Sequence, residues 1–201
     1  MFYSPFKYRV RPLFKRVMLL VLILCGISFS QIMAQREGNI WYFGEEAGMD
    51  FNMGAPVPLV NGAMTTFEGC AAISSPSGSL LFYTDGITIY NAQHVPMANG
   101  TGLMGDPSTS QSGVIVKLPG SNDIYYVFSV DNDAGPDGIR YSIVNTSLNG
   151  GLGAVTLKNI YMAAPVTEKI TAVSHRNGFD VWIMAHDFNS NNYISWLLTN
   201  S

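Results

Sequence analysis

A degenerate repeat constrains the fold of this chain more than any other feature of its sequence. Residues 68–86 read EGCAAISSPSGSLLFYTDG, in which two apolar runs stand on either side of a Ser/Pro/Gly corner. Short apolar runs bounded by turn-forming residues are typical of a β-hairpin. The phrase returns as EKITAVSHRNGFDVWIMAHD from residue 168, and a looser copy with a small offset begins at residue 111.

The spacing of these copies predicts a propeller. Ile73, Val116 and Val173 occupy the same place in the three copies, roughly 40 to 60 residues apart, and repeats of this length made of short strands indicate stacked blades. One such blade cannot bury its apolar face alone, so each needs a neighbour. The chain also lacks a long segment with a helical apolar period, which favours the all-β class.

We therefore expect an all-β fold over residues 35–201, a partial β-propeller of short antiparallel strands. Its blades start near residues 39, 68, 111 and 168, which makes about three to four blades, whereas a closed propeller has about 4 to 8. This difference predicts that the chain is a fragment of a larger protein. If it stands alone, the edge strand at residues 193–198 is the expected contact surface.

Residues 1–34 have the layout of a secretory signal peptide. A basic start is followed by an apolar stretch at residues 17–27 and a small residue, Ala34, after which we expect cleavage. The apolar stretch is shorter than the ~20 residues of a spanning helix, so no transmembrane span is expected once the leader is removed. A lipoprotein leader with Cys25 as the lipidated residue is the alternative, although Leu24 replaces the small residue expected before it.

Removal of the leader changes the charge of the chain. Five of the eleven Lys and Arg residues lie in it, which leaves six against fourteen Asp and Glu, a formal charge of −8. Such a balance argues against nucleic acid as a partner, because phosphate binding requires a basic patch. Cys70 is then the one remaining cysteine, which excludes a disulfide within the mature chain and suits a small buried hydrophobe.

Several phrases together resemble one group of exported proteins. NIWYFGEEAGMDFN, EGCAAIS, GSLLFYTDGITIYN, GPDGIRYSIVN and EKITAVSH, within residues 39–199, are similar to the N-terminal β-propeller region of large surface proteins of Bacteroidetes-type bacteria. Those proteins carry PKD-type repeats and a C-terminal domain associated with gliding motility and type IX secretion. The resemblance implies export through the inner membrane and a place at the cell surface or outside the cell, or in the periplasm if no C-terminal sorting domain exists.

Three polar residues recur at one place in the repeat. Glu68, Gln111 and Glu168 each stand just before the expected first strand of a copy, and the first strand of a propeller blade lines the central channel. We expect them to form part of a polar ring at one channel mouth, where a cation or another ligand would bind. The alternative is that each side chain caps its own blade by bonding to nearby backbone.

The loop DNDAGPDG is a second candidate site. Asp131, Asp133 and Asp137 stand at alternate positions except that Gly135 takes the place between the last two, and calcium loops place carboxylates at alternate positions around a glycine bend. The alternative is an ordinary turn in which Asp accepts hydrogen bonds from backbone amides. Calcium is thus the one cofactor that the sequence suggests.

Two functions fit this pattern. The first is a non-catalytic, cell-surface or secreted module for binding or adhesion, with a surface glycan or protein as ligand and the remaining domains of a parent protein as partners. The second is a hydrolase acting on polysaccharide or peptide at the propeller mouth. Glu68 and Glu168 would serve glycoside hydrolysis if their carboxyl groups were about 5–10 Å apart.

Overall fold

The computed structural model describes residues 36–200, and the regular secondary structure of this part of the chain is β-strand apart from one short 3-10 helix. The all-β prediction is therefore confirmed. The predicted leader at residues 1–34 lies outside the described residues. The strands are β1 (Ile40–Phe43), β2 (Ala47–Asp50), β3 (Val57–Leu59), β4 (Ala71–Ser74), β5 (Leu80–Thr84), β6 (Thr88–Asn91), β7 (Pro96–Thr101), β8 (Gly113–Lys117), β9 (Ile124–Val130), β10 (Ile139–Asn145), β11 (Ala154–Ala163), β12 (Val166–Ser174), β13 (Val181–Asp187) and β14 (Tyr193–Leu198), with one short 3-10 helix, η1 (Asn149–Gly151).

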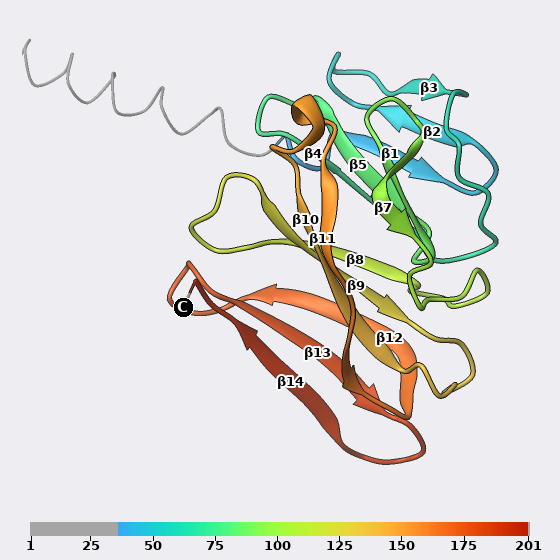
Figure 1. The fold of residues 1–201 in the computed structure, drawn as a ribbon, viewed down its shortest axis with the longest axis vertical. Coiled ribbons are helices and arrows are strands. Elements are labelled where there is room, and N and C mark those ends of the chain that lie inside the picture. Colours follow the sequence, from blue (N-terminus) through green and yellow to red (C-terminus); the bar gives the residue numbers. More distant parts are fainter. Residues whose placement is uncertain (1–35, 201) are drawn as a thin grey trace, which may run out of the picture. The chain divides into compact units, whose positions relative to one another are not determined.

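The strands form three sheets, as Figure 1 shows. β1–β2–β3 form the first and β12–β13–β14 the third, each as a simple antiparallel meander. The central sheet has eight strands in the order β4-β5-β6-β7-β11-β10-β9-β8. It consists of two four-stranded meanders joined through the parallel bridge Ala98–Ala154, and its two edge strands, β4 and β8, contact each other. The sheet therefore nearly closes on itself.

The predicted repeat is visible in the strand register. Ile73 pairs with Phe82 and Val173 pairs with Trp182, so the two hairpins span the same nine residues between equivalent partners. Val116 pairs with Tyr126, a separation of ten residues. The offset in the middle copy is therefore one extra residue in its turn.

A tight turn explains why the chain reverses between β5 and β6. The Asp85 carboxylate accepts hydrogen bonds from the backbone N–H groups of Ile87 and Thr88, at 2.8 and 2.6 Å. Gly86 adopts φ +85°, which L residues with a side chain rarely adopt, and a Cβ there would collide with the carbonyl oxygen of Ser112. Asp85 and Gly86 thus make the turn, and Gly86 leaves room for the backbone of Ser112.

Two segments have a structure that their local sequence does not suggest. Residues 94–110 are rich in Gly and Pro, yet they contain β7, in which Pro96 takes the first position. Proline is tolerated there because a strand's first residue need not donate to the ladder. Residues 154–161 belong to one ten-residue strand, β11, whose pairing with β10 is interrupted by bulges.

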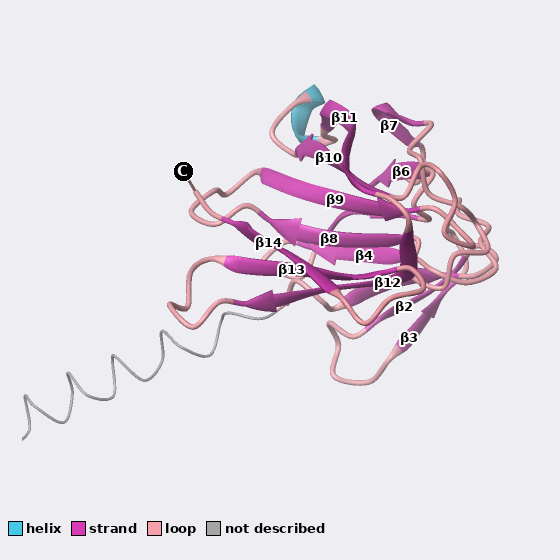
Figure 2. Cartoon of the chain, turned by 90° about the horizontal axis from the view of Figure 1, so that it is seen from below, coloured by secondary structure: helices cyan, strands magenta, loops and turns pink. Residues whose placement is uncertain are grey.

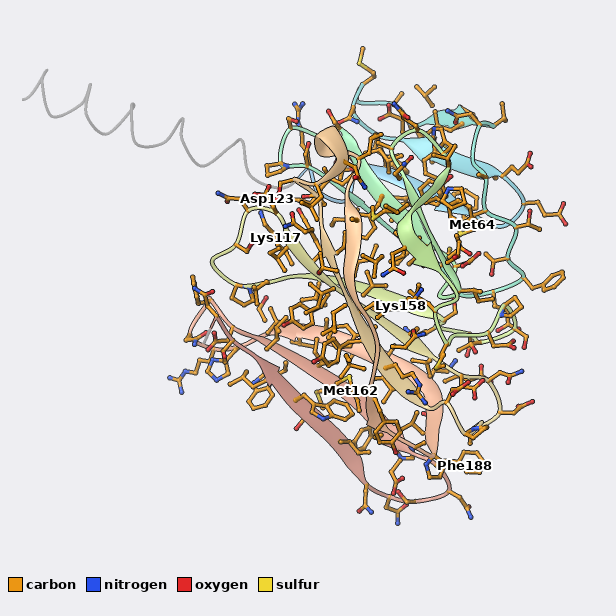
Figure 3. All side chains as sticks on the ribbon, viewed as in Figure 1. Met64, Lys117, Asp123, Lys158, Met162 and Phe188 are labelled. Carbon is orange, nitrogen blue, oxygen red and sulfur yellow. The ribbon has the colours of Figure 1, made fainter. Side chains whose placement is uncertain are left out.

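The core lies in three layers between consecutive strand groups. The first sheet packs on β4–β6 through Tyr42, Met64 and Tyr83, with the two tyrosine rings stacked at 4.5 Å between centroids. Phe82 and Tyr125 meet edge to face inside the central sheet, 5.5 Å apart. β8–β11 pack on the third sheet through a cluster that includes Met162, labelled in Figure 3.

The first sheet differs from the repeated hairpins in the direction of its first strand, β1. Residues 44–46 pair antiparallel with residues 64–66, through Glu46 N to Met64 O and Thr66 N to Gly44 O. Further along, Ser74 N donates to Glu37 O at 2.7 Å. β1 therefore runs opposite to β4 along its length.

Figure 2 shows the strands from below. Among residues 36–200, no helix has the length and apolar character needed to cross a bilayer.

β14 is an edge strand with alternating exposure, as the sequence suggested for residues 193–198. Whether it contacts another molecule stays a prediction.

Two phenylalanines offer a matched test of this core. Phe82 is fully buried, whereas Phe67 is 81% exposed. We expect Phe82→Ala to lower the free energy of unfolding by about 3–5 kcal/mol, because it removes a buried ring and leaves a cavity. Phe67→Ala should change it by less than about 0.5 kcal/mol. Urea unfolding followed by tryptophan fluorescence measures both, and equal losses would contradict the assigned core.

Candidate functional site

The segments that precede β4 and β8 meet side by side. Gly69 N donates to the carbonyl oxygen of Thr109 at 3.1 Å, and the buried Ser112 hydroxyl donates back to the carbonyl oxygen of Gly69. A Cβ at Gly69 would collide with the backbone nitrogen of Ser112. Glycine is therefore required for this approach, which holds the beginnings of the two strands together.

Glu168 links the start of β12 to two other segments. Its Oε2 accepts hydrogen bonds from the Ser110 backbone N–H at 2.8 Å and from the Ser110 hydroxyl at 2.9 Å. Its Oε1 accepts from the backbone N–H of Asp133 at 3.1 Å. Lys169 Nζ donates to the same Ser110 hydroxyl, and Gln111 Oε1 accepts from Ile170 N at 3.1 Å. We call Ser110, Gln111, Glu168 and Lys169 the polar junction.

The electrostatics of Glu168 follow from these contacts. The backbone N–H groups of Ser110 and Asp133 stabilise the carboxylate form and lower the pKa of Glu168 below its ordinary value, against the opposing effect of partial burial. The Ser110 hydroxyl and the nearby Lys169 ammonium act in the same direction. Glu168 is therefore an anion at neutral pH, with both oxygens engaged.

Three hollows open around the polar junction. One of about 470 Å³ lies between β4 and β8, and we call it the main hollow. A second, of about 280 Å³, is lined by Glu168, Lys169 and Phe188, the last labelled in Figure 3. A third, of about 180 Å³, is lined by Gln111, Lys169 and residues of β13 and β14. The main hollow is lined by Glu68, Gly69, Cys70, Ala71, Ala72, Ser110, Gln111, Gly113, Val114 and Ile115.

The structure brings the predicted ring residues together in part. Glu68 and Gln111 line the main hollow, and Gln111 and Glu168 both belong to the polar junction. Glu68 and Gln111 precede their strands, as expected, whereas Glu168 lies within β12, inside the irregular part of its register between Val166 and Ile170. Glu168 and Gln111 bond to neighbouring segments rather than to the hairpins that they begin. Ligand binding by these residues stays a prediction.

Sequence reasoning missed Ser110 and Lys169. Ser110 directly precedes Gln111 and Lys169 directly follows Glu168, so each adjoins a residue that the repeat does single out. Neither has a counterpart of its own type beside Glu68, where Phe67 and Gly69 stand. A search restricted to residues shared between copies therefore could not find them.

The aspartate loop uses the carboxylates of Asp131 and Asp137 within the protein. Asp131 Oδ1 accepts from Asn132 N at 2.9 Å and Oδ2 from Asp137 N at 3.1 Å. Asp137 pairs with Arg140 at 3.1 Å, and a Cβ at Gly135 would collide with Asp131 Oδ2. In the described part of the chain, no three His, Cys, Asp or Glu side chains are grouped as a metal site would require. Calcium binding by Asp131, Asp133 and Asp137 stays a prediction.

Cys70 lines the main hollow and also packs against the Tyr42–Met64–Tyr83 cluster. Burial raises the pKa of its thiol above the ordinary value, and the negative charge of Asp85 raises it further. The thiol form, which is a weak nucleophile, therefore predominates at neutral pH. This agrees with its interpretation as a small apolar side chain.

Comparison of the chain with protein-family models, with curated proteins and with solved structures found no match.

The state of Glu168 makes the stability of the fold depend on pH. Its folded pKa lies below 4.5, the ordinary value, so its stabilisation is present above about pH 5 and is lost as the pH falls through the folded pKa. Glu168→Gln should lower the free energy of unfolding by about 1–3 kcal/mol at pH 7, because charge-assisted hydrogen bonds are lost. The difference from wild type should shrink by pH 3.

Urea unfolding at several pH values measures this effect. Glu45→Gln is the matched control, because Glu45 is exposed in the β1–β2 turn and is not part of the polar junction. A difference between wild type and Glu168→Gln that stays constant from pH 7 to pH 3 would show that the carboxylate charge contributes nothing there.

Proposed function

We propose that the chain is an exported, non-catalytic binding module built on a partial β-propeller. The arrangement of strands supports this. β4–β7 and β8–β11 are each four-stranded meanders, which is the form of a propeller blade, and β12–β14 repeat its first three strands. The contacts of Gly69 with Thr109 and of Gln111 with Ile170 bring the starts of β4, β8 and β12 to one end, as first strands around a channel require.

The observation that carries the proposal is the main hollow beside the polar junction. Hydrogen bonds from separate hairpins hold its rim, including the contacts of Gly69 with Ser112 and of Ser110 with Glu168. A site whose walls are already held in place loses little conformational entropy when a ligand binds. A rigid, open hollow of this kind suits recognition.

The hydrolase alternative fits the geometry less well. Glu68 and Glu168 line different hollows, whereas a catalytic pair must flank one scissile bond. A general acid requires a raised pKa, but the pKa of Glu168 is lowered and both of its oxygens accept backbone hydrogen bonds. These features favour binding over hydrolysis.

The place of action in this proposal is the cell surface or the extracellular medium. The support is the signal-peptide layout of residues 1–34 and the resemblance of residues 39–199 to surface proteins. In such a protein the module would present its hollow to a surface glycan or a protein, next to the other domains of its parent chain. The periplasm is the corresponding place for a chain without a sorting domain.

Filling the main hollow tests the proposal. Ala71 lines it and belongs to none of the three core clusters, whereas Ala92 is exposed in the β6–β7 turn. We expect Ala71→Trp to weaken binding by at least about tenfold, and Ala92→Trp to leave it unchanged. The measurement is binding of the labelled protein to an array of surface polysaccharides and of basic, neutral and acidic peptides.

The melting temperature of each variant shows whether it is folded, and Ala71→Leu replaces Ala71→Trp if the larger side chain disrupts the sheet. Binding that persists in the folded Ala71 variant would place the site elsewhere. Release of shortened products from any polysaccharide or peptide of the array would instead favour the hydrolase.

A further inference from the structure

Glu68 is the one carboxylate that lines the main hollow, and it differs from Glu168 in its surroundings. Glu168 accepts three hydrogen bonds, whereas no hydrogen bond or ion pair within residues 36–200 engages the carboxylate of Glu68. Glu68 is also exposed. Its charge is therefore available to a ligand in the hollow.

The walls of the main hollow are small and aliphatic. Ala71, Ala72, Val114 and Ile115 contribute to them, and no aromatic residue is among the lining residues. The hollow thus offers an apolar surface without a ring face on which a flat group would stack. At its rim, the oxygen of the Gln111 amide is occupied by Ile170 N, which leaves the amide NH₂ as its remaining polar group.

A lysine side chain combines the two features that this surface complements. It carries an ammonium group at the end of a flexible apolar stem of four carbons, and such stems bury along apolar surface while the charge stays at the edge. Arginine fits less well, because its planar group gains most from stacking or from bidentate partners. The amide NH₂ of Gln111, which lines the hollow, would donate to a peptide carbonyl.

The charge of the whole domain acts in the same direction. Six Lys and Arg against fourteen Asp and Glu in residues 36–200 give a formal charge of −8. A field of this sign raises the local concentration of cations and speeds their association at low salt. The geometry points to a lysine-containing extended peptide as the ligand of the main hollow, with the ammonium on Glu68 and the stem against Ala72, Val114 and Ile115.

This inference rests on the proposed binding role of the same hollow and names its ligand class. The test uses blocked pentapeptides of four alanines around a central lysine, norleucine or arginine. Norleucine keeps the apolar stem and lacks the charge. We expect the lysine peptide to bind at least about tenfold more tightly than the norleucine peptide, a difference of ~1.4 kcal/mol, and more tightly than the arginine peptide.

Two variants locate the contact. Glu68→Gln should reduce binding of the lysine peptide to the level of norleucine, and Glu45→Gln, which removes the same charge from an exposed turn outside the hollow, should not. Titration followed by NMR reports both affinity and the integrity of the fold. High salt should weaken binding of the lysine peptide more than that of norleucine.

The outcomes separate this inference from the proposed function. Equal binding of the lysine and norleucine peptides, or a lysine preference that survives Glu68→Gln, overturns the ligand assignment. If the Ala71 variants abolish binding of some other polysaccharide or peptide of the array, the hollow remains a binding site, but for a different class of ligand. If they abolish no binding at all, the binding role and the ligand assignment fail together.

Discussion

The backbone hydrogen bonds accepted by Glu168 organise one end of this domain. The carboxylate reaches from β12 to the backbone of Ser110 and Asp133, in segments far away in the sequence. The Gly69–Thr109 and Gln111–Ile170 contacts complete the same line of attachment between β4, β8 and β12. Since the hollows lie along this line, their positions depend on it, and charge at Glu168 supports both the fold and the geometry of the site.

The features that the sequence predicted well are local. The hairpin at residues 68–86 and its counterpart from residue 168 could be recognised because alternation of apolar and turn-forming residues decides a hairpin within a few residues. The equal register of Ile73 with Phe82 and of Val173 with Trp182 reflects this. The turn at Asp85 and Gly86 is likewise encoded by the side chains that make it.

The features that it did not predict depend on distant partners. β7 is rich in residues that suit loops, and it is a strand because it pairs with β6 and bridges β11. The reversed direction of β1 arises from pairing of residues 44–46 with 64–66. Ser110 and Lys169 acquire their places from the packing of β8 beside β12. No local pattern carries such information, whereas Glu68, Gln111 and Glu168 could be named because the repeat aligns them.

The order of the sheets in space has a consequence for how the chain acquires its structure. Each strand group makes its main contacts with the group before or after it in the sequence: β1 with β4, β4 with β8, and β8 with β12. A polypeptide of this kind can fold vectorially, since each strand group that emerges finds its earlier partner already synthesised. Each layer is completed only when the next group arrives, as when Tyr125 of β9 covers Phe82 of β5. A chain that is synthesised from its N-terminus would thus add one layer at a time to the folded part.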